Sequence, residues 1–116
     1  MAKRSNEPAV WSLFSAGGVL SAMFMPAHVL LFGLAIPLGW VAEPSYEGLR
    51  ELAGNPVTRV YLFALCTFSM WHWAHRFRFA TIEGLQLKSI GMLIAVICYV
   101  CAFAGTITAG YLAWNL

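Results

Sequence analysis

The sequence contains very little charge. Only 10% of its 116 residues are Asp, Glu, Lys or Arg, and 60% are hydrophobic, whereas a soluble domain carries roughly 25% charged residues. These polar side chains are too few to cover a surface that faces water, so the composition favours a membrane protein over a soluble domain. The formal net charge of +2 and the lack of a basic stripe give no reason to expect nucleic-acid binding.

The few charges are also clustered, and three long stretches have none. These stretches are residues 8–42, 60–75 and 89–116. A helix needs about 20 apolar residues to cross the hydrocarbon of a bilayer. The middle stretch reaches that length only if it begins near Pro56 and includes Arg59, whose long side chain can extend to the headgroups.

This pattern predicts an all-α membrane protein with three transmembrane helices in a single membrane-anchor domain over residues 1–116. The predicted helices span about 8–36, 57–75 and 89–113. A short surface helix is expected at 46–53, in the first connection. The first apolar stretch is too long for the apolar region of a signal peptide, which has about 7–15 residues.

Carboxylates are missing from the predicted spans. Proton-coupled transporters use a membrane-embedded carboxylate, so this absence argues against a small transport module. The three cysteines offer little chemistry either. Cys98 and Cys101 form a CxxC inside an apolar span, whereas a redox pair normally exposes one thiol at a helix start beside a βαβ unit. We interpret them, and Cys66, as small hydrophobic residues.

The distribution of basic residues predicts the orientation. Lys3 and Arg4 precede the first span, and three more basic residues fall in the second connection, which is predicted over 76–88. The first connection holds only Arg50 and Arg59, and none follows the third span. Because basic residues favour the cytoplasmic side, the amino terminus is expected in the cytoplasm and the carboxyl terminus in the periplasm.

Local signals subdivide these spans. Pro26 should kink the first helix, because proline removes one backbone hydrogen bond, and PLG at 37–39 should end it. Small residues recur at helical spacing in the third helix, which allows close approach of helices in lipid. Ala102, Thr106 and Gly110 form one row and Gly105 and Ala109 another. If each row packs on a different helix, a partner membrane subunit is implied.

The three histidines suggest haem ligation. A haem with two histidine ligands needs both at a similar depth in the membrane. His28 lies roughly 25 Å along the first helix from Trp11, at 1.5 Å per residue, and is therefore toward the outer side, whereas His72 and His75 lie at the inner end of the second. His28 therefore cannot share one haem with His72 or His75. A haem held between one of these histidines and a ligand from a partner subunit stays an alternative.

The stretch WHWAHRFRF, residues 71–79, has a dense group of aromatic, titratable and cationic side chains. Such residues can belong to an aromatic belt with lipid-binding arginines. The alternative is a site for a quinone, which needs a flat aromatic slot, hydrogen-bond donors, a titratable group and a cation. Histidine, here His75, is the side chain type that exchanges protons near physiological pH, and an arginine such as Arg76 donates along a fixed fork. Trp71 and His72 are secondary candidates.

Trp11 brings the first helix to the same depth. It lies near the inner start of the first predicted helix, shortly after KRSNEP, so it is level with His75 and Arg76 if the predicted topology is right. By spacing alone, Trp11 fits an aromatic belt equally well.

Together these residues resemble a known family, the D subunit of bacterial quinol:fumarate reductase, which is one of its two small hydrophobic anchors. The similarity rests on KRSNEP followed by Trp11, FSAGG at 14–18, Pro26, PLG at 37–39 and His75-Arg76. It covers about the first 80 residues, and beyond them only the third hydrophobic span. His28 departs from the family pattern, and Phe77, Arg78 and Phe79 stand where the family often has further histidines.

The resemblance implies a membrane anchor in the bacterial inner membrane, built with a C subunit and carrying an iron–sulfur subunit and a flavoprotein subunit. Menaquinol would be oxidised between the anchors and the iron–sulfur subunit, and its electrons would reduce fumarate at the flavin. The quinone-binding residues implied here are Trp11, His75 and Arg76. This chain would hold no complete active site, no catalytic residue and no metal ligand of its own.

Two other functions stay open from the sequence. One is an anchor of a succinate dehydrogenase that binds haem b. Succinate dehydrogenases are related to the family named above, whose own anchors usually carry no haem. The other is a purely structural respiratory subunit that contacts only lipid and partner chains.

Overall fold

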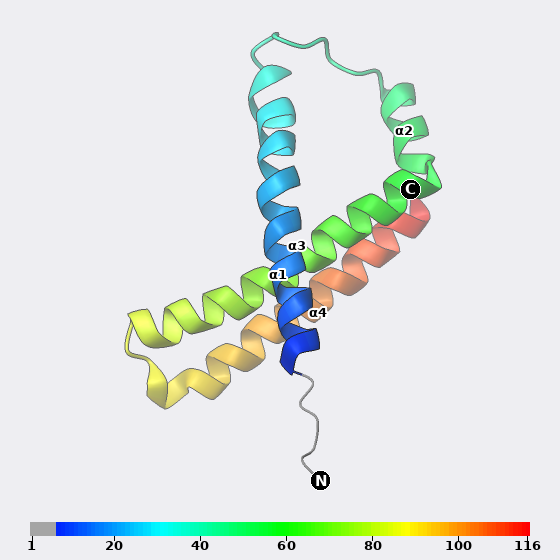
Figure 1. Cartoon of the computed structure of the whole chain (residues 1–116). Helices are drawn as coiled ribbons and strands as arrows, with labels where there is room; N and C mark the ends of the chain where they lie inside the picture. Colours follow the sequence, from blue (N-terminus) through cyan, green and yellow to red (C-terminus); the bar gives the residue numbers. More distant parts are fainter. Residues whose placement is uncertain (1–6) are drawn as a thin grey trace.

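The computed structural model describes residues 7–116, and every regular element in this range is helical (Figure 1). The four α-helices are α1 (Glu7–His28), α2 (Tyr46–Gly54), α3 (Pro56–Gly84) and α4 (Gly91–Asn115). The predicted all-α class is therefore confirmed. Lys3 and Arg4, which contribute to the predicted orientation, lie outside the described residues.

Two of the helical segments are long and apolar enough to cross a membrane. They are Trp11–Ala35 and Lys88–Asn115. The middle helix α3 is not among them, because its tryptophan, histidine and arginine residues lower its mean hydropathy. Its role as a third span therefore stays a prediction.

Helix α3 is longer than the segment 57–75 predicted for it. It continues through the whole WHWAHRFRF stretch to Gly84, and Gln86 in the turn that follows has φ 57°. The chain between Arg76 and Glu83 contains no glycine or proline that would interrupt a helix. The expected inner connection 76–88 is therefore corrected to a short turn after Gly84, since charge limits a membrane span but does not end a helix.

The first helix passes through Pro26 and changes character shortly afterwards. Residues Val29–Ala35 form a π-helical segment, so the predicted irregularity follows the proline by less than one turn. The PLG motif ends the helix as expected. Gly39 has φ 74°, a left-handed conformation that glycine adopts without steric cost.

Helices α3 and α4 lie side by side and antiparallel (Figure 1). Their contact is built on small residues, with Ala74 of α3 buried against Cys98 and Ala102 of α4. The two rows of small residues predicted on α4 lie beside each other and both turn toward α3, where Gly105 contacts Met70 and Gly110 contacts Phe63. They therefore form one packed face. Cys101, by contrast, is exposed.

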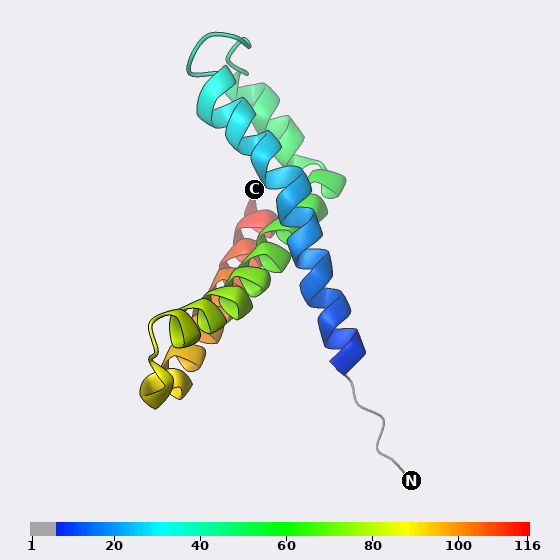
Figure 2. The same ribbon diagram turned by 60° about the vertical axis from the view of Figure 1, so that its left-hand side comes forward.

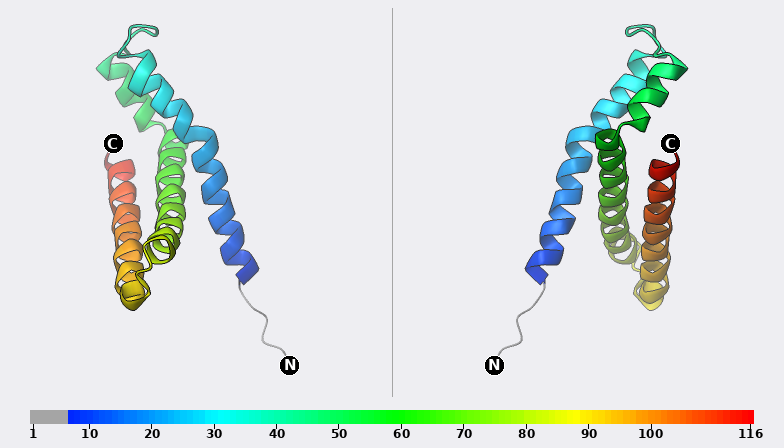
Figure 3. Two further views of the ribbon diagram at one scale, coloured as in Figure 1. Left: turned by 90° about the vertical axis from the view of Figure 1, so that its left-hand side faces the viewer. Right: turned by 90° about the vertical axis from the view of Figure 1, so that its right-hand side faces the viewer.

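Helix α1 crosses α3 at a pair of glycines on α1, Gly17 and Gly18. Gly17 is buried so closely that a Cβ there would lie 2.6 Å from the backbone oxygen of Phe68. Beside it, the hydroxyls of Ser21 and Ser69 are hydrogen-bonded at 2.7 Å. On the amino-terminal side of this crossing α1 diverges from α3 and α4 (Figures 2 and 3). The amino-terminal end of α1 lies on the same side as the turn between α3 and α4.

Arg59 ties together three helix ends at the opposite side of the structure. Its guanidinium group donates to the carbonyl oxygens of Trp114, at 3.5 Å, and of Leu116, and its Nε donates to that of Ala53 at 3.4 Å. Cations are favourable at helix carboxyl termini because the carbonyls there have no intrahelical donor.

We expect Arg59→Ala to loosen the carboxyl-terminal end of α4 without unfolding the chain. Loss of these bonds should raise amide hydrogen exchange at residues 112–116 several-fold, since terminal turns open with little cost in free energy. Hydrogen-exchange mass spectrometry in detergent measures this effect, with Arg50→Ala on α2 as the matched control. Equal exchange in both variants would contradict the role given to Arg59.

Candidate functional site

A cavity of about 880 Å³ lies where α1 diverges from α3 and α4. All three helices contribute to its walls, and most of its side chains are aromatic. The lining residues are Trp11, Leu13, Phe14, Thr67, Phe68, Trp71, His75, Arg76, Phe79, Glu83 and Tyr99. The volume falls within the range of about 300–1,000 Å³ that is usual for small-molecule sites.

Four of the residues predicted from the sequence meet in this cavity. Trp11 comes from α1, and Trp71, His75 and Arg76 come from α3. The rings of Trp11 and His75 are edge-to-face with centroids 6.1 Å apart. This contact is possible because Gly17 and Gly18 let α1 approach α3 closely at His72, which precedes His75 by one helical turn.

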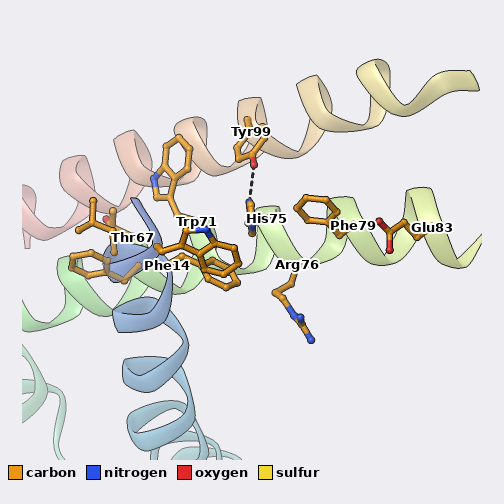
Figure 4. A pocket seen from close by; sticks show the side chains of 11 residues that line it. Phe14, Thr67, Trp71, His75, Arg76, Phe79, Glu83 and Tyr99 are labelled. Carbon is orange, nitrogen blue, oxygen red and sulfur yellow. Dashed lines mark hydrogen bonds between the residues drawn. The ribbon is translucent and has the colours of Figure 1, made fainter. Parts of the chain in front are cut away.

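His75 is enclosed by aromatic rings and held by one polar contact. Phe14 and Phe79 pack edge-to-face on it, at centroid distances of 4.6 and 5.0 Å. Its Nδ1 lies 3.0 Å from the hydroxyl oxygen of Tyr99 on α4. Figure 4 shows these two side chains pointing toward each other, while Arg76 extends from α3 away from α4.

Trp71 forms the wall between α3 and α4. Its indole Nε1–H donates to the hydroxyl of Thr106 at 3.0 Å, and that hydroxyl donates to the Ala102 carbonyl at 2.9 Å. The indole is therefore fixed by a hydrogen bond as well as by packing. A rigid aromatic face is the kind of surface on which a planar ring can stack.

His72 lies beside this cavity and lines a neighbouring one, also of about 880 Å³. Its ring stacks on Phe14, with centroids 4.4 Å apart. Its Nδ1–H donates to the Phe14 carbonyl at 3.1 Å, because a carbonyl oxygen can only accept. His72 thus contributes to the α1–α3 contact, and Arg76 and Glu83 line both cavities.

His28 is part of a separate cluster near the start of α3. Its Nδ1–H donates to the Phe24 carbonyl at 2.7 Å, so its Nε2 accepts from the Tyr61 hydroxyl at 3.3 Å. The imidazole also stacks on Tyr61. Both nitrogens are engaged by the chain, so iron ligation at His28 would require the Tyr61 bond to break. The described residues contain no group of three or more His, Cys, Asp or Glu that could hold a metal ion.

Sequence reasoning gave a role to only four of the eleven lining residues. Among the seven that it missed, Phe14 and Tyr99 contact His75 directly and Glu83 is charged. Phe14 begins the FSAGG motif but has no predicted role, Tyr99 lies inside the CxxC, and Glu83 falls in the stretch expected to be a connection. The period of a helix could have found Glu83, which lies two turns after Arg76 on a similar face. Nothing in the sequence indicates that Tyr99 faces His75, because the pairing depends on how α4 packs on α3.

The arrangement has the groups needed to bind a planar, redox-active ring. Aromatic side chains form the walls. Arg76, which is permanently charged, can donate a hydrogen bond to a ligand oxygen, and His75 can exchange a proton. Thr67 adds a buried hydroxyl that has no hydrogen-bond partner within residues 7–116. The cavity is partly open, and the Trp11 side chain in its wall is 59% exposed.

The sequence matches a known family over almost its whole length. The model of the family described as the D subunit of fumarate reductase matches residues 1–113. The fumarate reductase D subunit of Mycobacterium tuberculosis (strain H37Rv) is 44% identical over 110 residues, which cover 95% of this chain and 88% of the relative. The protein of the same name from Vibrio campbellii is 38% identical over 109 residues, 92% of this chain and 84% of the relative.

Proposed function

Because this chain belongs to the family of fumarate reductase D subunits, we propose that it is a membrane-anchor subunit of a quinol:fumarate reductase. It attaches the flavoprotein and iron–sulfur subunits to the bacterial inner membrane, together with the C subunit. It performs no catalysis on its own, and it helps to form the site at which menaquinol is oxidised.

In this function the chain spans the membrane three times, with its amino terminus in the cytoplasm and its carboxyl terminus in the periplasm. Two segments are apolar enough to span by themselves, and α3 lies antiparallel to one of them. The start of α1 and the α3–α4 turn are on one side, as Figure 3 illustrates. In the sequence, Lys3 and Arg4 precede α1 and Lys88 shortly precedes α4, and basic residues favour the cytoplasm.

The observation that carries the quinol site is the shared cavity of Trp11, His75 and Arg76. We assign Trp11 to one wall of the ring slot. Arg76 donates to one quinone oxygen, directly or through water, and stabilises the negative charge that develops on it. His75 exchanges a proton with the same ligand. A ligand oxygen near Thr67 would also satisfy a hydroxyl whose burial without a partner costs about 1–3 kcal/mol.

Oxidation of a quinol to a quinone releases two electrons and two protons. The electrons pass to the iron–sulfur subunit and then to the flavin, where they reduce fumarate to succinate. The protons are taken up by side chains or water at the site. The cavity is partly open, and the iron–sulfur subunit and the C subunit would complete its walls.

Trp11→Ala in the purified complex tests this function. We expect the KM for menaquinol in fumarate reduction to rise about tenfold, since loss of a stacked aromatic side chain costs roughly 1–1.5 kcal/mol. The rate with an artificial donor that bypasses the membrane should not change. The control is Trp40→Ala, which removes an exposed tryptophan just after the end of the first helix. Equal KM values in both variants would mean that Trp11 belongs to an aromatic belt.

A further inference from the structure

Tyr99 is the one cavity residue contributed by α4, and it is firmly held. Its ring packs against the buried cluster formed by Ala74, Cys98 and Ala102. Trp71 lies beside it, with ring centroids 6.0 Å apart, and the guanidinium carbon of Arg78 lies 5.6 Å from its ring centroid. Its hydroxyl therefore has a fixed position at the cavity wall.

The hydroxyl of Tyr99 makes the only hydrogen bond to His75 found among residues 7–116, to Nδ1 at 3.0 Å. The other neighbours of the imidazole are the rings of Trp11, Phe14 and Phe79, which restrain the ring without specifying where its proton lies. Because a phenol hydroxyl can donate or accept, Tyr99 can hold His75 in either of its two neutral tautomers.

The two tautomers have different chemical consequences. If Nδ1 carries the proton, it donates to the tyrosine oxygen, and Nε2 keeps a lone pair that can accept a proton. If Nε2 carries the proton, the tyrosine donates to Nδ1, and the histidine has no basic nitrogen available to a ligand. Only the first arrangement suits the oxidation of a quinol, which must lose its hydroxyl protons.

We propose that Tyr99 is a positioning residue for quinol oxidation, which holds His75 through Nδ1–H and leaves Nε2 as the proton acceptor. This inference rests on the proposed function. Oxidation breaks two quinol O–H bonds: one proton forms an Nε2–H bond on His75, the other goes to water or another side chain, and the two electrons would leave to the iron–sulfur subunit. The bond from Nδ1–H to Tyr99 persists in the imidazolium and becomes charge-assisted, which makes it stronger.

Other charged and titratable groups lie around His75 without a hydrogen bond to it among the described residues. On α3, Arg76 and Glu83 line the same cavity, His72 stacks on Phe14, which also contacts His75, and Arg78 lies against the Tyr99 ring. The described part of α1 lines the cavity only with apolar and aromatic side chains. Tyr99→Phe leaves the four groups on α3 in place and keeps the aromatic ring. A change in the pH dependence of this variant therefore reports the loss of the hydroxyl.

The experiment is menaquinol-driven fumarate reduction by the purified complex carrying Tyr99→Phe. We expect kcat to fall about tenfold, less than the 10²–10⁴-fold that general acid–base catalysis usually contributes, because His75 itself is still present, while KM changes less than twofold. The pH–rate profile should shift, and activity with the bypass donor should stay at the wild-type level. Tyr111→Phe is the matched control, because this tyrosine lies on the same helix and is 67% exposed.

Two results would overturn the proposal. An unchanged kcat and pH profile would mean that the hydroxyl does not act through His75. A raised KM with unchanged kcat would make Tyr99 a wall of the binding site and not a positioning residue. Arg76→Ala, measured in the same assay, distinguishes the role of Tyr99 from the quinol site itself. If it lowers quinol activity while Tyr99→Phe does not, only the role of Tyr99 fails, and if neither variant lowers it, the quinol site fails as well.

Discussion

Replacing Arg76 with alanine should lower menaquinol-driven fumarate reduction at least tenfold, while the assembled complex and its bypass activity survive. Among the residues that line the cavity shared by Trp11 and His75, Arg76 is the one with a permanent positive charge. It is exposed to the cavity and makes no hydrogen bond with another described residue of the chain, so its donors are available to a ligand. Loss of a charge-assisted hydrogen bond to a developing oxyanion corresponds to a barrier increase of about 1.4 kcal/mol or more.

Two companion variants sharpen this measurement. Arg76→Lys keeps the charge but loses the fork of donors, and we expect activity between those of the alanine variant and the wild type. Arg50→Ala removes an exposed arginine from α2, far from the cavity, and should have no effect on quinol activity. Persistence of full quinol activity in Arg76→Ala would make this residue a headgroup anchor. If the complex failed to assemble in Arg76→Ala, the stretch WHWAHRFRF at residues 71–79 would be mainly a docking surface for a partner subunit.

Substituting alanine for Gly17 should destabilise the α1–α3 crossing and damage the cavity together with it. The new Cβ would lie 2.6 Å from the backbone oxygen of Phe68 and 3.2 Å from the Cβ of His72. A backbone oxygen cannot move aside as a flexible side chain does, so the helices must separate. Overpacking of this kind costs about 1–3 kcal/mol. We expect a lower midpoint of thermal inactivation and a smaller fraction of assembled complex on size-exclusion chromatography.

Gly33→Ala is the matched control for that experiment, because it lies in the same continuous helix. Its Cβ would meet only Cγ1 of Val29, at an ordinary contact distance of 3.7 Å. Alanine is favoured over glycine within a helix by up to about 1 kcal/mol, so this variant should be neutral or slightly more stable. If both variants behaved alike, helix propensity and not close packing would govern the crossing.

The apolar stretches and most helix limits could be predicted from the sequence, since both depend on local properties. The first and third predicted helices agree with the structure to within two residues at each described end, if the π-helical segment and the short 3-10 helix Lys88–Ile90, which directly precedes α4, are included. The surface helix at 46–53 is present as α2. Hydropathy and the conformational limits of proline and glycine act over a few residues, so a single chain shows them directly.

The end of α3 could not be predicted from the distribution of charge. The sequence shows where charge resumes, at Arg76, and the predicted span ends just before it. The residues that follow are compatible with a helix, which therefore continues to Gly84. As a result, Phe79 and Glu83 become part of the cavity wall. A membrane boundary reflects the cost of burying charge, whereas a helix ends when the backbone loses its pattern of hydrogen bonds.

By itself the sequence determined the long apolar stretches and most helix limits, and it offered Trp11, His75 and Arg76 as candidates for a quinone site. Only the tertiary structure decided that Trp11 reaches His75 and that Tyr99 bonds to it. Hydropathy and turn signals are properties of neighbours along the chain. Contacts between helices depend on the angle and rotation at which small residues such as Gly17 let them pack, and these are fixed only when the whole bundle forms.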